Sequence, residues 1–168
     1  MKAILEAKGL PPLPAKSVTR DTERLDWKEA FVKHGYHLDR PVHSTSFGQS
    51  MRWYDESGKY VRSIDMGVVF GDDHADARQE VMGFLNFRSS APLIPDRVDI
   101  MKDGPGDLCV AGVNPHSEEY RHGKRPYELI FVRDQVGVVL KCGAEDVDLL
   151  PIARVLDRVI QACPEKQK

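Results

Sequence analysis

Apolar and polar positions in the last third of the chain alternate in a pattern that predicts a β-hairpin. Residues 127–132 and 136–141 are rich in β-branched and aromatic side chains and flank a polar stretch. A two-residue loop at 134–135 would pair Arg133 with Val136. The pairs that follow are Phe131 with Val138, Leu129 with Leu140 and Tyr127 with Cys142 on one face, and Ile130 with Val139 and Glu128 with Lys141 on the other. We expect the first, wholly apolar face to pack against a helix.

The residues after this hairpin have the spacing of an amphipathic helix. Glu145, Asp146 and Asp148 crowd its start, where carboxylates cap free N–H groups and meet the positive end of the helix dipole. Pro164 ends it. Apolar residues recur at steps of three and four, namely Leu149, Ile152, Ala153, Leu156, Val159 and Ile160. We expect the intervening polar residues, Arg154, Asp157 and Arg158, to face water.

A second hairpin is predicted from residues 42–54 and 59–70, which flank the turn-rich tetrad 55–58. A four-residue loop would pair Tyr54 with Lys59. The pairs on the apolar face are then Trp53 with Tyr60, Phe47 with Met66, Thr45 with Val68 and His43 with Phe70. Arg62 and Gln49 are polar exceptions on that face. Two interpretations of Arg62 remain open. Either its aliphatic carbons lie along Trp53 at the margin of the sheet, or its guanidinium faces a ligand.

Helical spacing and turn residues indicate the remaining elements. A helix is predicted from residue 21 or 22 to His34, where Gly35 ends it, and a second helix from 71–73 to about Phe87. A short strand is predicted at 98–101, and a further strand at 108–113 runs antiparallel to 127–132. Residues 1–20 form an extended, proline-containing leader that either wraps the domain or is loose, with a proline-rich ligand as the sharper alternative. Residues 21–164 form a single domain, and 165–168 form a polar tail.

This order of elements predicts an α+β fold. Adjacent antiparallel strands with helices nearby favour a two-layer sandwich, with a sheet of about five to six strands and the helices packed on one face. Many binding domains share such an architecture, so the fold alone does not assign a function.

Composition narrows the classes of partner. Charged residues make up 30% of the chain and the net charge is −2, which argues against a nucleic-acid binder. No run of about 18 apolar residues predicts a membrane span, and the N-terminus does not have the pattern of a signal peptide. The predicted topology brings Cys109 near Cys163, so a disulfide between them is conceivable, against the alternative of buried, reduced thiols. The compartment stays open, with an extracytoplasmic location, after removal of a signal, slightly favoured over the cytoplasm by that bond and by the leader-like N-terminus.

Candidate metal ligands are densest where the first helix ends. His34, His37 and His43 could supply imidazole ligands to zinc, and a metal-dependent hydrolase is therefore the alternative function. Gly35 breaks the helix between the first two, and no His-Glu-x-x-His motif is present, so surface histidines are the simpler interpretation. The acidic run 72–76 lacks the spacing of a calcium loop and suits a helix start. No Gly-x-Ser-x-Gly or phosphate-binding loop is present, and we expect no cofactor.

The long polar segment 114–126 is the best candidate for a binding site. An irregular segment of this length is uncommon in a compact domain and is more often functional. Its donors and charges are His116, Tyr120, Arg121, His122, Lys124 and Arg125. We therefore expect a non-catalytic binding or accessory domain that uses this loop, Arg62 and the sheet rim to engage a protein partner or a small anionic ligand. The chain would be a monomer or weak homodimer, and a subunit that adds an edge strand to a neighbour is a further alternative.

Overall fold

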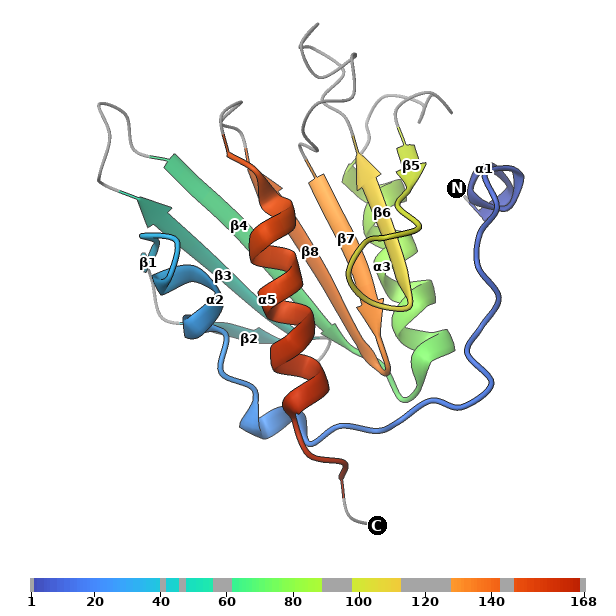
Figure 1. Cartoon of the computed structure of the whole chain (residues 1–168), viewed down its shortest axis with the longest axis horizontal. Coiled ribbons are helices and arrows are strands. Elements are labelled where there is room, and N and C mark those ends of the chain that lie inside the picture. The colour runs from blue at the N-terminus through green and yellow to red at the C-terminus, as the bar shows by residue number, and fades with distance from the viewer. Residues whose placement is uncertain are drawn as a thin grey trace, which may run out of the picture.

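The fold is a strongly antiparallel α+β sandwich, seen in a computed structural model that describes residues 2–39, 42–45, 48–55, 62–88, 98–112, 128–142 and 147–166 (Figure 1). Within those residues, eight strands form one sheet in the order β1-β3-β4-β8-β7-β6-β5, with β2 pairing with β3 beside β1. The helices are α1 (Lys2–Ala7), η1 (Thr22–Arg24), α2 (Lys28–Val32), α3 (His74–Arg88) and α5 (Leu149–Ala162). The strands are β1 (His37–Leu38), β2 (His43–Thr45), β3 (Gly48–Asp55), β4 (Arg62–Phe70), β5 (Val98–Ile100), β6 (Leu108–Gly112), β7 (Glu128–Arg133) and β8 (Val136–Cys142).

The central hairpin has the predicted register. Arg133 pairs with Val136, Phe131 with Val138, and the series continues to Glu128 and Lys141. Asp134 in the two-residue loop takes a φ of 53°, a left-handed conformation that aspartate tolerates better than most residues. Tyr127 lies outside the described residues. The strand at 108–112 pairs antiparallel with β7, also as predicted.

The predicted register of the second hairpin is wrong by four residues. Asp55 pairs with Arg62, and Trp53 pairs with Ile64, so the connection begins after Asp55 instead of before it. The strand predicted over 42–54 is in fact two strands, because β2 folds back antiparallel onto β3. His43 therefore pairs with Ser50 of β3 and not with Phe70, while Phe70 pairs with Val136 of β8 on the other side of β4. Phe47 and Tyr60 lie outside the described residues.

The final helix forms as expected, whereas the first one does not. The Asp148 side chain caps α5 by accepting a hydrogen bond of 3.0 Å from the Leu150 N–H. The helix predicted over 22–34 is split into η1 and α2. Asp26 accounts for this break, because its carboxylate accepts a hydrogen bond of 3.0 Å from the Lys28 N–H and so starts a new helix. Gly35 does end α2, with a φ of 81°.

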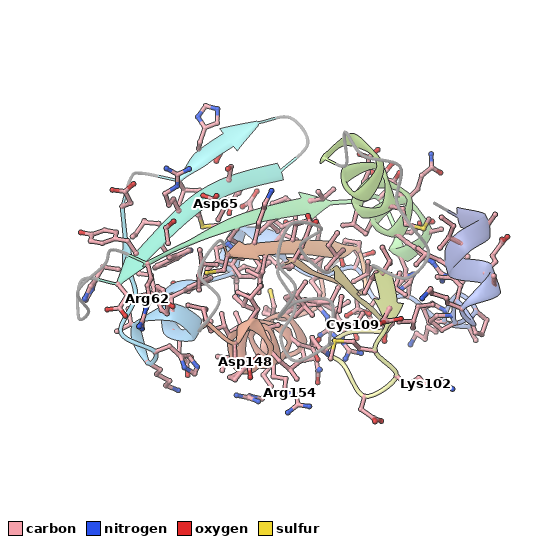
Figure 2. All side chains as sticks on the ribbon, turned by 90° about the horizontal axis from the view of Figure 1, so that it is seen from above. Arg62, Asp65, Lys102, Cys109, Asp148 and Arg154 are labelled. Atoms are coloured by element: carbon pink, nitrogen blue, oxygen red, sulfur yellow. The ribbon has the colours of Figure 1, made fainter. Side chains whose placement is uncertain are left out.

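Helices cover both faces of the sheet, which corrects the prediction that they pack on one face. Figure 1 shows α2 and α5 in front of the sheet and α3 behind it, and Figure 2 shows the same layers from above. The α5 side is packed on Phe131, Val138 and Leu140. The α3 side is packed on Ile130 and Val139, the residues that already made the second face partly apolar. The sheet also has more strands than the predicted five to six.

The leader wraps the domain, one of the two predicted alternatives, but the prediction that it is extended throughout is wrong, because Lys2–Ala7 form the helix α1. Leu5 of α1 is fully buried in the same cluster as α3, and an extended stretch leads from there to the far end of the sheet (Figure 1). There Arg20 forms an isolated antiparallel bridge with Glu165, after the end of α5. Residues near both ends of the chain are therefore held against the β7–β8 turn.

Candidate functional site

The loop predicted to bind a ligand lies outside the described residues. This holds for His116, Tyr120, Arg121, His122, Lys124 and Arg125 alike. Its two anchors are described: Gly112 at the end of β6 pairs with Glu128 at the start of β7. The loop is therefore attached at the end of the sheet opposite the β7–β8 turn.

Arg62 lies at that same end of the sheet, as the first residue of β4 (Figure 2). Its Nη1 atom is 3.9 Å from Oδ2 of Asp55, the residue it pairs with across the hairpin. Asp55 is buried, while the Arg62 side chain keeps 37% of its surface exposed. The guanidinium thus reaches solvent beside a carboxylate, and its contact with a ligand stays a prediction.

The three histidines proposed as metal ligands do not come together. All three are exposed, and His37 and His43 pair with Tyr54 and Ser50 of β3. Four residues along a strand separate those partners by about 13 Å, which is too far for two ligands of one zinc ion. Across the described part of the chain, no group of three or more His, Cys, Asp or Glu residues could hold a metal ion.

The three cysteines are free and buried, which corrects the conceivable Cys109–Cys163 disulfide. Cys163 instead donates from Sγ to the carbonyl oxygen of Asp21 at 3.0 Å. Cys109 lies in the core beneath α5, and burial raises the pKa of its thiol to about 12. The argument from this bond for an extracytoplasmic location therefore falls away.

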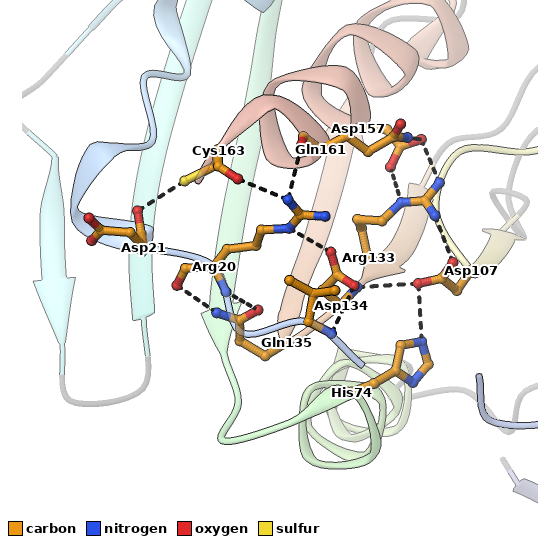
Figure 3. Close-up of polar contacts among 11 residues, drawn as sticks. Arg20, Asp21, His74, Asp107, Arg133, Asp134, Gln135, Asp157, Gln161 and Cys163 are labelled. Atoms are coloured by element: carbon orange, nitrogen blue, oxygen red, sulfur yellow. Dashed lines mark hydrogen bonds and ion pairs between the residues drawn. The ribbon is translucent and has the colours of Figure 1, made fainter. Parts of the chain in front are cut away.

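A polar network surrounds the β7–β8 turn, and sequence patterns did not reveal it (Figure 3). Arg133 donates to both carboxylate oxygens of Asp157, from Nε at 2.7 Å and from Nη2 at 3.0 Å. Its Nη1 donates to Asp107 at 2.7 Å. The hydrogen bond that Asp157 accepts, and then the negative charges of Asp157, Asp107 and Asp134, raise the pKa of Arg133 above its usual value, although burial opposes the shift. Asp157, predicted to face water, is buried.

The same network holds the leader in place. Arg20 donates from Nε to Asp134 at 2.8 Å and from Nη1 to the carbonyl oxygen of Cys163 at 2.9 Å. The Gln135 side chain forms two hydrogen bonds with the backbone of Arg20, at 3.0 and 2.9 Å. Because these bonds join the leader, the turn and the end of α5, we interpret the network as structural.

His74, at the start of α3, lies at the edge of this network. It is 2% exposed, and neither of its ring nitrogens has a hydrogen-bond partner among the residues that the structure describes. Its Nε2 atom is 3.7 Å from Oδ2 of Asp107, beyond hydrogen-bonding distance. Burial lowers the pKa of His74, and the nearby Arg78 charge lowers it further, although Asp107 opposes the shift. The imidazole is therefore neutral in the folded protein at neutral pH.

A groove of about 800 Å³ opens between the leader and α3. It is lined by Glu6, Leu10, Pro11, Pro12, Leu13, Ala75, Arg78, Gln79, Glu80, Met82 and Gly83. Arg78 forms part of its wall and donates from Nη2 to the carbonyl oxygen of Pro11 at 2.7 Å. Burial lowers the pKa of this guanidinium. The spacing of α3 predicted a helix but gave no sign of the groove, because its other wall comes from the leader.

Comparison of this chain with protein-family models, with curated proteins and with solved structures finds no match. Among the helices in the described ranges, none has the length and apolar character needed to cross a membrane.

Proposed function

We propose that this chain is a non-catalytic binding or accessory domain. It engages a small anionic ligand, or an acidic surface of a partner protein, through the rim, which we define as Arg62 and the loop 114–126. The basic residues of the loop supply donors for carboxylate or phosphate groups.

The ends of strands β4, β6 and β7 that flank the proposed site lie at one end of the sheet, and this position is the main support for the proposal. The last described residue before the loop, Gly112, and the first after it, Glu128, lie beside each other, and Lys141 of β8 pairs with Glu128. Arg62 begins β4 at this same end of the sheet. Loops carried by a rigid scaffold are the common location of binding residues, so this arrangement supports the rim as the site.

The chemistry of the described side chains supports binding over catalysis. Cys109 is held protonated by burial, which makes it a poor nucleophile. The buried carboxylate of Asp157 and the half-buried one of Asp107 are both engaged by Arg133, in contacts that join α5 to the sheet. These groups have structural partners that account for their positions.

Calorimetric titration with citrate tests the proposal. The full chain is compared with a rim variant carrying Arg121→Ala, Lys124→Ala and Arg125→Ala. The matched control carries Lys28→Ala, Lys102→Ala and Arg154→Ala, which remove the same charge from exposed positions elsewhere. We expect saturable binding that the rim variant loses and the control keeps.

Equal loss in both variants would contradict the proposal, because it would mean that only net charge matters. A polyglutamate peptide titrated in parallel separates the two classes of ligand. Binding of the peptide without binding of citrate would identify an acidic protein partner. Binding of neither probe to the wild-type chain would reject the rim as an anion site.

A further inference from the structure

Arg78 is a buried cation whose charge the described protein does not neutralise. The residue keeps 6% of its surface exposed, and burial is what shifts its pKa. Among the described residues, no carboxylate forms an ion pair with it, and the hydrogen bond that it makes goes to the uncharged carbonyl of Pro11. By contrast, Arg133, which is also largely buried, is engaged by two carboxylates.

An unpaired guanidinium in such a place is energetically unfavourable. A buried charge normally has a charged partner, because its loss of hydration is not recovered otherwise. Within the described part of the chain, the one carbonyl of Pro11 leaves most of the five N–H donors of the guanidinium without an acceptor. A bound carboxylate would accept two of these hydrogen bonds in parallel and neutralise the charge.

The groove beside Arg78 determines what kind of carboxylate fits. Its volume of about 800 Å³ is in the range of pockets that hold small organic ligands. Leu10, Leu13 and Met82 give it apolar walls, and the Leu13 side chain is 53% exposed. Two acidic residues, Glu6 and Glu80, also line it, and they disfavour a multiply charged anion such as phosphate.

We propose that this groove binds a small organic monocarboxylate with an apolar body, and that Arg78 holds the carboxylate. The apolar body lies between the leader and α3, against Leu13 and Met82. The site shares no residue with the rim, so it goes beyond the proposed function and stands independently of it.

Calorimetric titration of the full chain with sodium octanoate tests this site. Arg78→Met keeps an unbranched apolar stem and removes the charged guanidinium, and we expect octanoate affinity to fall by at least about tenfold. Arg154→Met is the matched control, because Arg154 is exposed and points away from the sheet on α5 (Figure 2). Octanol, which lacks the carboxylate, should bind wild-type protein at least about tenfold more weakly than octanoate.

A second variant keeps the test valid if Arg78→Met unfolds the protein. Leu13→Glu adds a carboxylate to the groove wall at an exposed position and leaves the bond from Arg78 to Pro11 intact. It should weaken octanoate binding by about tenfold without lowering the melting temperature. No saturable octanoate binding to wild-type protein, or equal binding by the wild type and Leu13→Glu, would overturn the proposal. Failure of citrate to bind would leave this site unaffected, because that probe tests the rim.

Discussion

Arg133 and Asp157 form a bidentate ion pair between the sheet and α5, with donor–acceptor distances of 2.7 and 3.0 Å. Gln161, one turn further along α5, adds a hydrogen bond to the same carboxylate at 2.9 Å. The pair lies beside the turn that also holds the leader (Figure 3). We conclude that these contacts stabilise this end of the molecule, whereas the binding site that we propose, the rim, is at the opposite end of the sheet.

Replacing Asp157 by Asn should destabilise the protein by about 2–3 kcal/mol, because a largely buried guanidinium loses its main partner. The Asp157 side chain is 11% exposed and that of Arg133 is 22% exposed, so solvent screens the pair only weakly. Urea unfolding measures the change in the free energy of unfolding.

The control is Asp65→Asn, which breaks the ion pair of Arg52 with Asp65. That pair is as short, at 2.7 Å, but its side chains are 50% and 44% exposed. Its loss should destabilise the protein less than the loss of Asp157 does, because solvent screens an exposed ion pair. Equal effects of the two substitutions would show that the Arg133–Asp157 pair contributes no more than a surface contact.

Asp157 also illustrates where sequence reasoning reached its limit. The apolar stripe of α5 correctly identifies Leu149, Ile152 and Leu156 as buried. The same spacing assigns Asp157 to the polar side, because the pattern of one helix cannot reveal an arginine on a neighbouring strand. Tertiary partners decide whether a charged residue at the edge of a stripe is exposed.

The two hairpins show what an alternating pattern can and cannot determine. In both, the apolar residues of the described strands fall on the predicted face, because side chains alternate with a period of two. A shift of the pairing by four residues preserves that face, so the pattern could not detect the error between Trp53 and its partner. Only the length of the connection fixes such a shift, and β3 extends to Asp55 while β4 begins at Arg62, not at the predicted Lys59.

The pH dependence of stability should reveal the buried His74. Because its folded pKa is lowered, the unfolded chain binds a proton more readily below about pH 6.5. The contribution of His74 to stability is therefore present above that pH and is lost as the pH falls toward the folded pKa. Asp107, Asp134 and Asp73 oppose this shift and Arg78 enhances it.

We expect unfolding free energies to decline more steeply from about pH 7 to pH 5 in the wild type than in His74→Gln, which cannot titrate. Urea unfolding at a series of pH values measures both slopes. Identical slopes in the two proteins would mean that the imidazole titrates alike in the folded and unfolded states.

Two glycines provide a matched test of the packing on the α3 face. A methyl group at Gly137 of β8 would lie 2.3 Å from Cγ1 of Val81, so Gly137→Ala should destabilise the protein by about 1–3 kcal/mol. Gly83, in the middle of α3, has open space around its Cα. Gly83→Ala should stabilise the protein by about 0.5–1 kcal/mol, since alanine favours the helix. Thermal unfolding distinguishes the opposite signs, and a neutral Gly137→Ala would argue against α3 packing closely on β8.

Thiol titration tests whether Cys109 and Cys163 are free thiols or form a disulfide. The chain has three cysteines, and all are free and buried. Ellman's reagent should therefore react slowly with the native protein and release three equivalents from the unfolded protein without prior reduction. One equivalent would instead mean that a disulfide had formed.

The sites were less predictable than the fold, for a physical reason. The proposal of the rim rests mainly on one basic segment, 114–126, which is visible directly in the sequence. The groove needed Arg78 of α3 and Pro11 of the leader to be brought together, and these are distant in sequence. Sites assembled from separate elements leave no local pattern in the chain.

The most direct test of whether stability and binding are separated at the two ends of the sheet is thermal melting of the rim variant, with and without citrate. This variant carries Arg121→Ala, Lys124→Ala and Arg125→Ala. We predict a melting temperature within about 3 °C of the wild type without citrate. Citrate should raise the melting temperature of the wild type and leave that of the variant unchanged. A variant that melts as low as Asp157→Asn, or that citrate stabilises as much as the wild type, would contradict this division.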